Sequence, residues 1–340
     1  MRLRAAAALA AVCAAGCAAP PPAVDANAAR SHAVRLALVP GGPHPYFTAW
    51  KPAGERAAAD FGIGEVAYDD TSNWDQEAQN RRLDDLAARG YTAFGVFGVS
   101  AVDINDTFGN LTSTGLVVAA LASCPAAEVN LAAFCLATDV ERAAYLGAKA
   151  AIAAMGGKGD LVHLTGNRVD TNTERRMAGV RHAVAETGGS VRLLATIADV
   201  DTDAGTADAA VDALLDEHGR TIDAVVATGY VPAVAAVAGV GAAGLPIRVV
   251  AIDDDPVILD GIRDGSVEAT VVQNPEGQAY VGAWALTQLA IGECTLRQPG
   301  VFVDSGSFVV DAGNVDTYDA LREAKTAALR DEFLSTVLAC

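Results

Sequence analysis

The sequence predicts an α/β protein built from two open, doubly wound parallel-sheet lobes. Short β-branched segments alternate with longer amphipathic segments from residue 35 to about residue 292, which is typical of parallel sheets covered by helices on both faces. The spacing divides into two similar series, one before Asp139 and one after. A chain of 340 residues also exceeds the usual size of a single hydrophobic core, so we expect two lobes.

Nine segments have the length and residue types of strands. They are residues 35–39, 65–68, 93–97, 116–120, 161–164, 191–196, 224–227, 248–252 and 269–272. The intervening segments have helical periodicity; in 77–87, for example, Leu83 and Leu86 share one face, and Glu77 and Arg81 lie on the other. Ligands of such sheets bind at the carboxyl ends of the strands, so the residues that follow each strand are the candidates for a site.

The N-terminus has the features of an export signal. Two arginines precede an apolar stretch at 5–15, which is too short to span a bilayer. The ending Ala14-Ala15-Gly16-Cys17 resembles the lipobox of bacterial lipoproteins, so residues 1–17 are predicted to be a lipoprotein signal with Cys17 lipidated and 18–33 a tether. We therefore expect an extracytoplasmic protein, periplasmic or on the cell surface, anchored to the membrane by lipid. An ordinary signal peptide that is cut elsewhere is the alternative.

The charge and hydropathy of the chain limit its partners. A net charge of −18 argues against nucleic acid, because a protein that binds phosphates needs a basic face. It also discourages contact with anionic headgroups, so membrane attachment should come from the lipid alone. The apolar run 230–247 is interrupted by Pro232 and several glycines, and we interpret it as a buried surface helix.

Four cysteines remain outside the export signal, and they allow three disulfide connectivities. Proximity in the sequence favours Cys124 with Cys135, which leaves Cys294 with Cys340. Free buried thiols are the alternative. A metal site is not predicted, because the cysteines have neither CxxC spacing nor a nearby histidine.

Aromatic residues gather after the first predicted strand. His44, Tyr46, Phe47 and Trp50 all lie there, and aromatic faces bind the C–H faces of sugar rings while leaving the hydroxyls free for polar partners. Phe47 and Trp50 have a second interpretation, as core residues of the following helix.

Polar candidates follow strands of the second series. Asn172 and Arg176 lie where a polar loop enters a helix, and a guanidinium can bridge adjacent hydroxyls, although an arginine here can also pair with a surface carboxylate. Asp253 comes directly after a strand, and its carboxylate can accept hydrogen bonds from two vicinal hydroxyls. Gln273 ends another strand and can both donate and accept. Tyr230, which follows the strand at 224–227, is the last candidate.

In these clusters the chain resembles the type I periplasmic binding proteins, the sugar-binding family that includes the ribose-binding proteins. The motifs that carry the resemblance are Pro45-Tyr46-Phe47, Ala137-Thr138-Asp139, 159–166 followed by Asn172, Arg176 and Gly179, Ala251-Ile252-Asp253, Asp264-Gly265 and Val272-Gln273-Asn274-Pro275. The resemblance implies two lobes joined by a three-crossover hinge. It also implies that the lobes close over a monosaccharide-like ligand and deliver it to an ABC permease. It supports Tyr46, Phe47, Asp253 and Gln273 as ligand contacts.

The resemblance also sets the expected domains. They are an N-lobe of residues 34–137 plus 275–297, a C-lobe of residues 138–274 plus 298–312, and a C-terminal helix and tail of residues 313–340. Several positions depart from the family pattern: His44 stands where asparagine is common, Glu174 where ribose binders have arginine, and Gly229-Tyr230 where Asn-Asp is common. We therefore expect a different pentose, a hexose, a cyclitol or another small polyol instead of ribose.

The expected function is that of a monomeric solute-binding lipoprotein of an ABC transporter. An exported sensor that passes its closed shape to a chemoreceptor or kinase, on binding a sugar or an autoinducer-like ligand, is the alternative, as is a nucleoside-binding lipoprotein. No enzyme activity or cofactor is predicted. The motif Gly239-Val-Gly-Ala-Ala-Gly244 matches GxGxxG, but it precedes a strand, whereas a dinucleotide-binding loop follows one.

Overall fold

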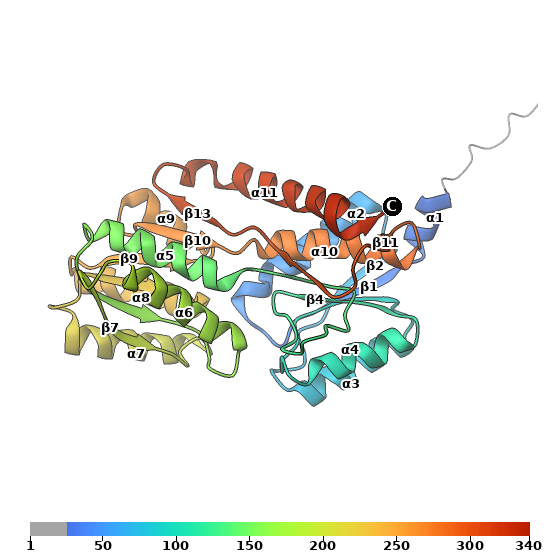
Figure 1. Ribbon diagram of the computed structural model, residues 1–340, viewed down its shortest axis with the longest axis horizontal. Coiled ribbons are helices and arrows are strands. Elements are labelled where there is room, and N and C mark those ends of the chain that lie inside the picture. The colour runs from blue at the N-terminus through green and yellow to red at the C-terminus, as the bar shows by residue number, and fades with distance from the viewer. Residues whose placement is uncertain (1–25) are drawn as a thin grey trace, which may run out of the picture.

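Residues 26–340 are described by a computed structural model, in which the chain forms two α/β lobes side by side (Figure 1). The predicted lipidation residue Cys17, the signal 1–17 and the first part of the tether lie outside the described residues. Among the residues described, no helix is both long and apolar enough to cross a membrane.

The N-lobe is a six-stranded parallel sheet with helices on both faces. Its strands run in the order β12 (Val301–Asp304), β5 (Phe134–Ala137), β4 (Val117–Leu121), β3 (Ala93–Val96), β1 (Arg35–Val39) and β2 (Glu65–Tyr68). One core lies between the sheet and the helices α2 (Trp50–Phe61) and α10 (Pro275–Ala290). The other core lies under α3 (Gln76–Ala88) and α4 (Ile104–Ser113).

The C-lobe repeats this plan. Its strands run in the order β13 (Phe308–Asp311), β10 (Ala269–Val272), β9 (Arg248–Ile252), β8 (Ala224–Ala227), β6 (Gly159–Leu164) and β7 (Val191–Ile197), and β13 alone is antiparallel to its neighbour. The helices α5 (Val140–Ala154) and α6 (Thr171–Ala185) cover one face. The helices α7 (Ala204–His218), α8 (Tyr230–Ala243) and α9 (Pro256–Asp264) cover the other. The predicted fold class is confirmed.

The domain assignment of residues 298–312 was wrong for its first part. We expected residues 298–312 in the C-lobe, but β12 within this range pairs with β5 of the N-lobe, from Val301 beside Phe134 to Asp304 beside Ala137. The backbone then crosses between the lobes and continues as β13, which pairs with β10. The pattern of hydrophobic residues in this segment fits either sheet, because each sheet offers an edge with similar apolar neighbours.

The three crossovers are held together by a buried polar cluster. The crossovers contribute Thr138, the pair Gln273 and Asn274, and Ser305. The Ser305 hydroxyl donates to the Gln273 carbonyl oxygen at 2.8 Å, and the hydroxyls of Thr138 and Ser305 lie 3.0 Å apart. Gln278 of α10 donates from Nε2 to both hydroxyls at 3.2 Å. We call Thr138, Gln273, Asn274, Gln278 and Ser305 the hinge cluster; each of these side chains is almost completely buried.

Replacing Gln278 by methionine should destabilise the protein markedly. Methionine keeps the approximate shape of the side chain but leaves the buried hydroxyls of Thr138 and Ser305 without this donor, so we expect a loss of about 2–4 kcal/mol in the free energy of unfolding. Urea unfolding measures it. The control is Gln298→Met at an exposed position. Equal stability of the two variants would contradict the assigned role of the hinge cluster.

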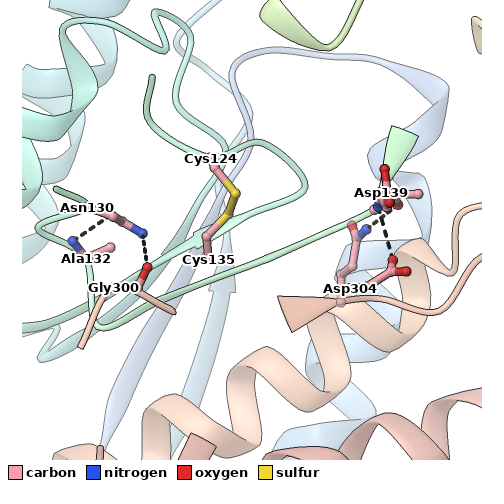
Figure 2. The surroundings of a disulfide bond; sticks show 9 residues. Cys124, Asn130, Ala132, Cys135, Asp139, Gly300 and Asp304 are labelled. Atoms are coloured by element: carbon pink, nitrogen blue, oxygen red, sulfur yellow. Dashed lines mark hydrogen bonds between the residues drawn. A yellow bond between two sulfur atoms is a disulfide. The ribbon is translucent and has the colours of Figure 1, made fainter. Parts of the chain in front are cut away.

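Both predicted disulfides are present in the structure, Cys124 with Cys135 and Cys294 with Cys340. Figure 2 shows that the first closes the loop between β4 and β5. At the end of this loop Asn130 receives a hydrogen bond from the Ala132 amide at 3.0 Å and donates to the Gly300 carbonyl oxygen at 3.4 Å (Figure 2). The loop is thereby attached to the segment that enters β12.

The two ends of the described chain lie on the N-lobe. Residues 26–32 of the expected tether form the helix α1 (Ala26–His32), so the tether prediction was wrong for this part. Arg30 in this helix donates to the Ile291 carbonyl oxygen at 3.0 Å and pairs with Glu293 at 3.2 Å.

The long helix α11 (Tyr318–Glu332) runs beside α10 along both lobes (Figure 1). The remaining elements are η1 (Pro45–Ala49), η2 (Val315–Thr317), η3 (Phe333–Val337) and the small pair β11 (Thr295–Leu296) with β14 (Leu338–Ala339).

Candidate functional site

A cavity of about 270 Å³ lies between the two lobes, at the carboxyl ends of both parallel sheets. This is the position that the doubly wound topology favours for ligands. The N-lobe side is lined by His44, Tyr46, Phe47, Trp74, Phe97, Gly98, Val99, Ala101, Ala122 and Ser123. The C-lobe side is lined by Gly166, Asn167, Val169, Asp170, Asn172, Arg176, Asp201, Thr202, Thr228, Tyr230, Asp253 and Gln273.

The structure brings together eight of the nine side chains that the sequence singled out for ligand binding. These eight line the cavity, and they are His44, Tyr46, Phe47, Asn172, Arg176, Tyr230, Asp253 and Gln273. The exception is Trp50, which is completely buried in the N-lobe core and is absent from the cavity wall. Trp50 begins α2 and turns its indole under Phe47, with ring centroids 4.9 Å apart, so its expected contact with ligand was wrong.

The N-lobe wall is largely aromatic. His44 caps the short helix η1, where its Nδ1 accepts from the Tyr46 amide at 3.2 Å, and this turn directs Phe47 toward the cavity. Phe47 packs against Phe97 with centroids 5.2 Å apart, and Trp74 stands nearly perpendicular to Phe97 at 6.0 Å. The result is an apolar surface that fits the C–H face of a ring.

Sequence reasoning missed Trp74 and Phe97. Trp74 lies in the loop after β2 with a left-handed backbone (φ 62°), and its indole packs on Gly41 and Gly42, where an added Cβ would come within 2.8 Å of the ring. In the sequence, the two adjacent glycines after β1 were the signal that a large side chain packs against the backbone there. The sequence pattern predicts Phe97 as the last residue of a strand, but β3 ends one residue earlier and Phe97 lines the cavity.

The C-lobe wall is polar, and Asp253 lies at its centre. Its side chain follows β9 with a left-handed backbone (φ 64°), a conformation that costs energy outside glycine and that tends to occur at functional sites. Gln273 donates from Nε2 to the two carboxylate oxygens of Asp253 at 3.2 and 3.0 Å. Arg176 in turn donates to Oε1 of Gln273 at 3.4 Å, so the three side chains form a chain of hydrogen bonds.

Burial raises the pKa of Asp253 to about 8, and the neighbouring Asp254 adds to this rise. The hydrogen bonds from Gln273 and the charge of Arg176 oppose it without cancelling it. A group that donates hydrogen bonds or carries positive charge would favour the ionised form of this carboxyl.

The outer part of the site contains two further carboxylates. Asp170 accepts from the Asn172 amide at 2.9 Å at the start of α6, and burial raises the pKa of its carboxyl, with Arg176 opposing the rise. Asp201 accepts from the Val231 amide at 2.8 Å at the start of α8.

His44 links the lobes across this outer part of the site. Its Nε2 lies 3.5 Å from Asp201, and its ring meets that of Tyr230 edge-on with centroids 6.2 Å apart. His44 comes from the N-lobe, whereas Asp201 and Tyr230 come from the C-lobe, so these contacts span the cleft. Tyr230 itself donates to Asp255 at 3.1 Å.

Nothing in the described residues forms a cluster of three or more histidine, cysteine, aspartate or glutamate side chains suited to a metal ion. The site instead combines ring faces with donors and acceptors of hydrogen bonds. Such a combination can hold and orient a small hydroxylated molecule.

Replacing Asp253 by asparagine should stabilise the ligand-free protein at alkaline pH. Between the ordinary carboxyl pKa of 3.8 and about 8, the folded state retains a proton that the unfolded chain releases, so the carboxyl lowers stability as pH rises through this window. Asparagine has no such proton. We expect a gain of at least about 1 kcal/mol in the free energy of unfolding at pH 8.5 and a smaller gain at pH 5. Urea unfolding at the two pH values tests this, with exposed Asp208→Asn as control. An effect of the same size at both pH values would contradict the prediction.

Solved structures with the same two-lobed fold cover most of this chain. An ABC transporter solute-binding protein from Burkholderia graminis, in complex with D-arabinose, superposes with a TM-score of 0.75 at 20% identity over 84% of this chain and 97% of that chain. A periplasmic solute-binding protein from Actinobacillus succinogenes with bound D-allose gives 0.75 at 21% identity over 84% and 100%. One from Bacillus halodurans with bound myo-inositol gives 0.74 at 18% identity over 85% and 98%. At these identities the likeness concerns the fold.

The sequence itself matches the family model of the periplasmic binding protein domain over residues 37–294. This range includes the strands of both sheets except β12, β13 and the first two residues of β1, and it contains every side chain that lines the cavity. The chain belongs to the periplasmic binding protein family.

Proposed function

We propose that the protein is an extracytoplasmic solute-binding lipoprotein of an ABC transporter. It binds a monosaccharide or small polyol between its lobes and delivers this ligand to a permease. The observation that carries the proposal is the division of the cavity, with an aromatic wall on the N-lobe and a hydrogen-bonding wall on the C-lobe. The acting step is binding, with no bond made or broken.

The two walls suit complementary parts of a sugar. The faces of Phe47 and Trp74 bury the C–H surface of the ring, while Asp253 accepts hydrogen bonds from its hydroxyls. Hydrogen bonds to a charged partner contribute about 1.5–3 kcal/mol each, so a few of them orient the ligand strongly. The family members with bound D-arabinose, D-allose and myo-inositol support a ligand of this size and chemistry.

Ligand binding between the lobes favours the closed form. Only a closed protein brings the aromatic wall and the polar wall to one ligand at the same time, so the ligand shifts the equilibrium between open and closed forms. Contacts such as His44 with Asp201 then add to closure. A permease that recognises both lobes in this arrangement would respond to the loaded form.

The proposed location and attachment rest on the N-terminal sequence. The lipobox-like ending at Cys17 supports lipidation, and the tether would leave a monomeric binding protein close to the membrane. The two disulfides support an oxidising compartment outside the cytoplasm.

A thermal-shift screen of sugars, cyclitols, other polyols and nucleosides tests the proposal on the exported chain from residue 18. A ligand at about 100 times its dissociation constant stabilises the folded state by about 2.7 kcal/mol, which raises the melting temperature measurably. We expect hits among the sugars or polyols. A response to nucleosides alone would contradict the proposed ligand class.

Arg176→Ala should weaken binding of such a hit by about 10- to 100-fold, because it removes a charged donor from the cavity wall. The neighbouring Arg175 is a matched control, since it pairs with Asp139 at 3.3 Å and does not line the cavity. Isothermal titration of both variants should show a loss for Arg176→Ala and unchanged affinity for Arg175→Ala. Equal affinities would remove Arg176 from the site.

A further inference from the structure

The cavity contains more carboxylates than cations. Asp170, Asp201 and Asp253 line it, whereas Arg176 is the single lysine or arginine among the lining residues in the described part of the chain. His44 adds a positive charge only when it is protonated. Burial favours the protonated form of Asp253 when the cavity is empty, and a cationic ligand would favour its ionised form, whereas a neutral sugar would bring no positive charge to this wall.

The cations near the cavity are already engaged. Nη1 of Arg176 lies 3.8 Å from Asp170, and Nη2 donates to Gln273. Arg168, an exposed residue between the lining residues Asn167 and Val169, pairs with two acidic side chains, Glu174 at 3.6 Å and Asp199 at 3.5 Å. Neither arginine forms an ion pair with Asp201 or Asp253 within residues 26–340, and Arg176 favours the ionised form of Asp253 only through its charge.

Further carboxylates stand behind the wall. Asp254 accepts a hydrogen bond from Tyr318, and Asp255 accepts one from Tyr230. These phenols are neutral donors, so both carboxylates add negative potential at the cavity. A cleft lined by one sign of charge between low-dielectric walls concentrates its field and attracts ligands of the opposite sign.

One carboxylate oxygen is positioned to receive a cation. Oδ1 of Asp201 accepts from the Val231 amide and faces His44, but no hydrogen bond or ion pair within residues 26–340 uses its Oδ2. Gly166 lies beside it, and a Cβ added there would be 3.8 Å from Oδ2 and 3.3 Å from Arg176. The same Cβ would lie 2.9 Å from the Thr173 hydroxyl, so the glycine allows these polar side chains to stand close together at this point of the wall.

The aromatic wall also suits a cation. Faces of tryptophan and phenylalanine attract an ammonium group within about 6 Å of the ring centre, and the attraction increases when water is excluded. Trp74, Phe47 and Phe97 present such faces from the N-lobe, opposite the carboxylates of the C-lobe.

We infer that the ligand is a hydroxylated ring compound carrying a protonated amine, that is, an amino sugar or amino cyclitol, with the ammonium group at Asp201. This inference rests on the proposed function and specifies its ligand. Asp253 and Gln273 take the hydroxyls at the inner end of the cavity, and the ammonium group compensates the excess negative charge at the outer end.

Matched ligand pairs test the inference by isothermal titration of the exported chain at pH 7. The pairs are D-glucosamine with D-glucose, D-galactosamine with D-galactose, and an amino-deoxyinositol with myo-inositol, and the N-acetylated amines serve as neutral controls with a substituent at the same position. We expect at least one amine to bind about 10-fold or more tightly than its neutral parent and its N-acetyl form. The preference should decrease as salt is added, because part of it comes from the field of the whole protein.

A charge-only variant locates the ammonium group. Asp201→Asn keeps the oxygen that accepts from the Val231 amide but removes the charge, and it should lower the preference for the amine by about 10-fold. Asp199→Asn removes a charge of the same sign at a position outside the cavity wall and should leave the preference unchanged. A preference that survives Asp201→Asn would overturn the assignment to Asp201.

The outcomes distinguish the inference from the function on which it rests. If neutral parents bind as tightly as the amines or more tightly, the inference is wrong and the proposed sugar-binding function stands. If neither the amines nor their neutral parents bind, and the wider sugar and polyol screen is also negative, the proposed function fails together with the inference.

Discussion

The buried polar cluster at the hinge is the constraint on which the rest of the structure depends. Three chain crossings meet there, and the hydroxyls of Thr138 and Ser305, the Gln273 carbonyl and the Gln278 amide bind one another away from water. Hydrogen bonds in such an environment are strong, and a broken one leaves a costly unpaired group. Tyr46 extends the cluster into the ligand cavity, since its hydroxyl donates to Gln278 at 2.8 Å. The lobes are thereby joined at a fixed point from which the cavity opens.

The cavity has two kinds of wall because it lies between two sheets, and different side chains follow the strands of each sheet. The loops of the N-lobe carry rings, supported by glycines that let Trp74 lie flat on the backbone. The loops of the C-lobe carry carboxylates, each fixed by a helix start or by Gln273. Side chains that are already held in place lose little conformational entropy when a ligand binds, which favours affinity. The same fixation holds Asp170, Asp201 and Asp253 on one wall of the cavity, where they favour a ligand that carries a positive charge.

The sequence allowed the fold and eight of the side chains that line the cavity to be predicted. Strand segments and the rule that ligands lie at strand ends were enough to identify Asp253 and Gln273. The sequence did not reveal which lobe β12 joins. Backbone pairing with β5 determines this, and the pattern of apolar residues does not. The sequence also did not reveal which way the side chains of Trp50 and Trp74 point. A single turn buries Trp50 in the core, and a loop with a left-handed backbone brings Trp74 to the cavity.

We expect ligand bound at the cavity to close the lobes about the hinge. The most direct measurement is the distance between spin labels on the two lobes, at Asn110→Cys in α4 and Ala209→Cys in α7, both exposed. The four native cysteines of the described chain are in disulfides, so labels attach to the new thiols. A saturating ligand should shorten and narrow the distance distribution. A distribution unchanged by a ligand that demonstrably binds would contradict it.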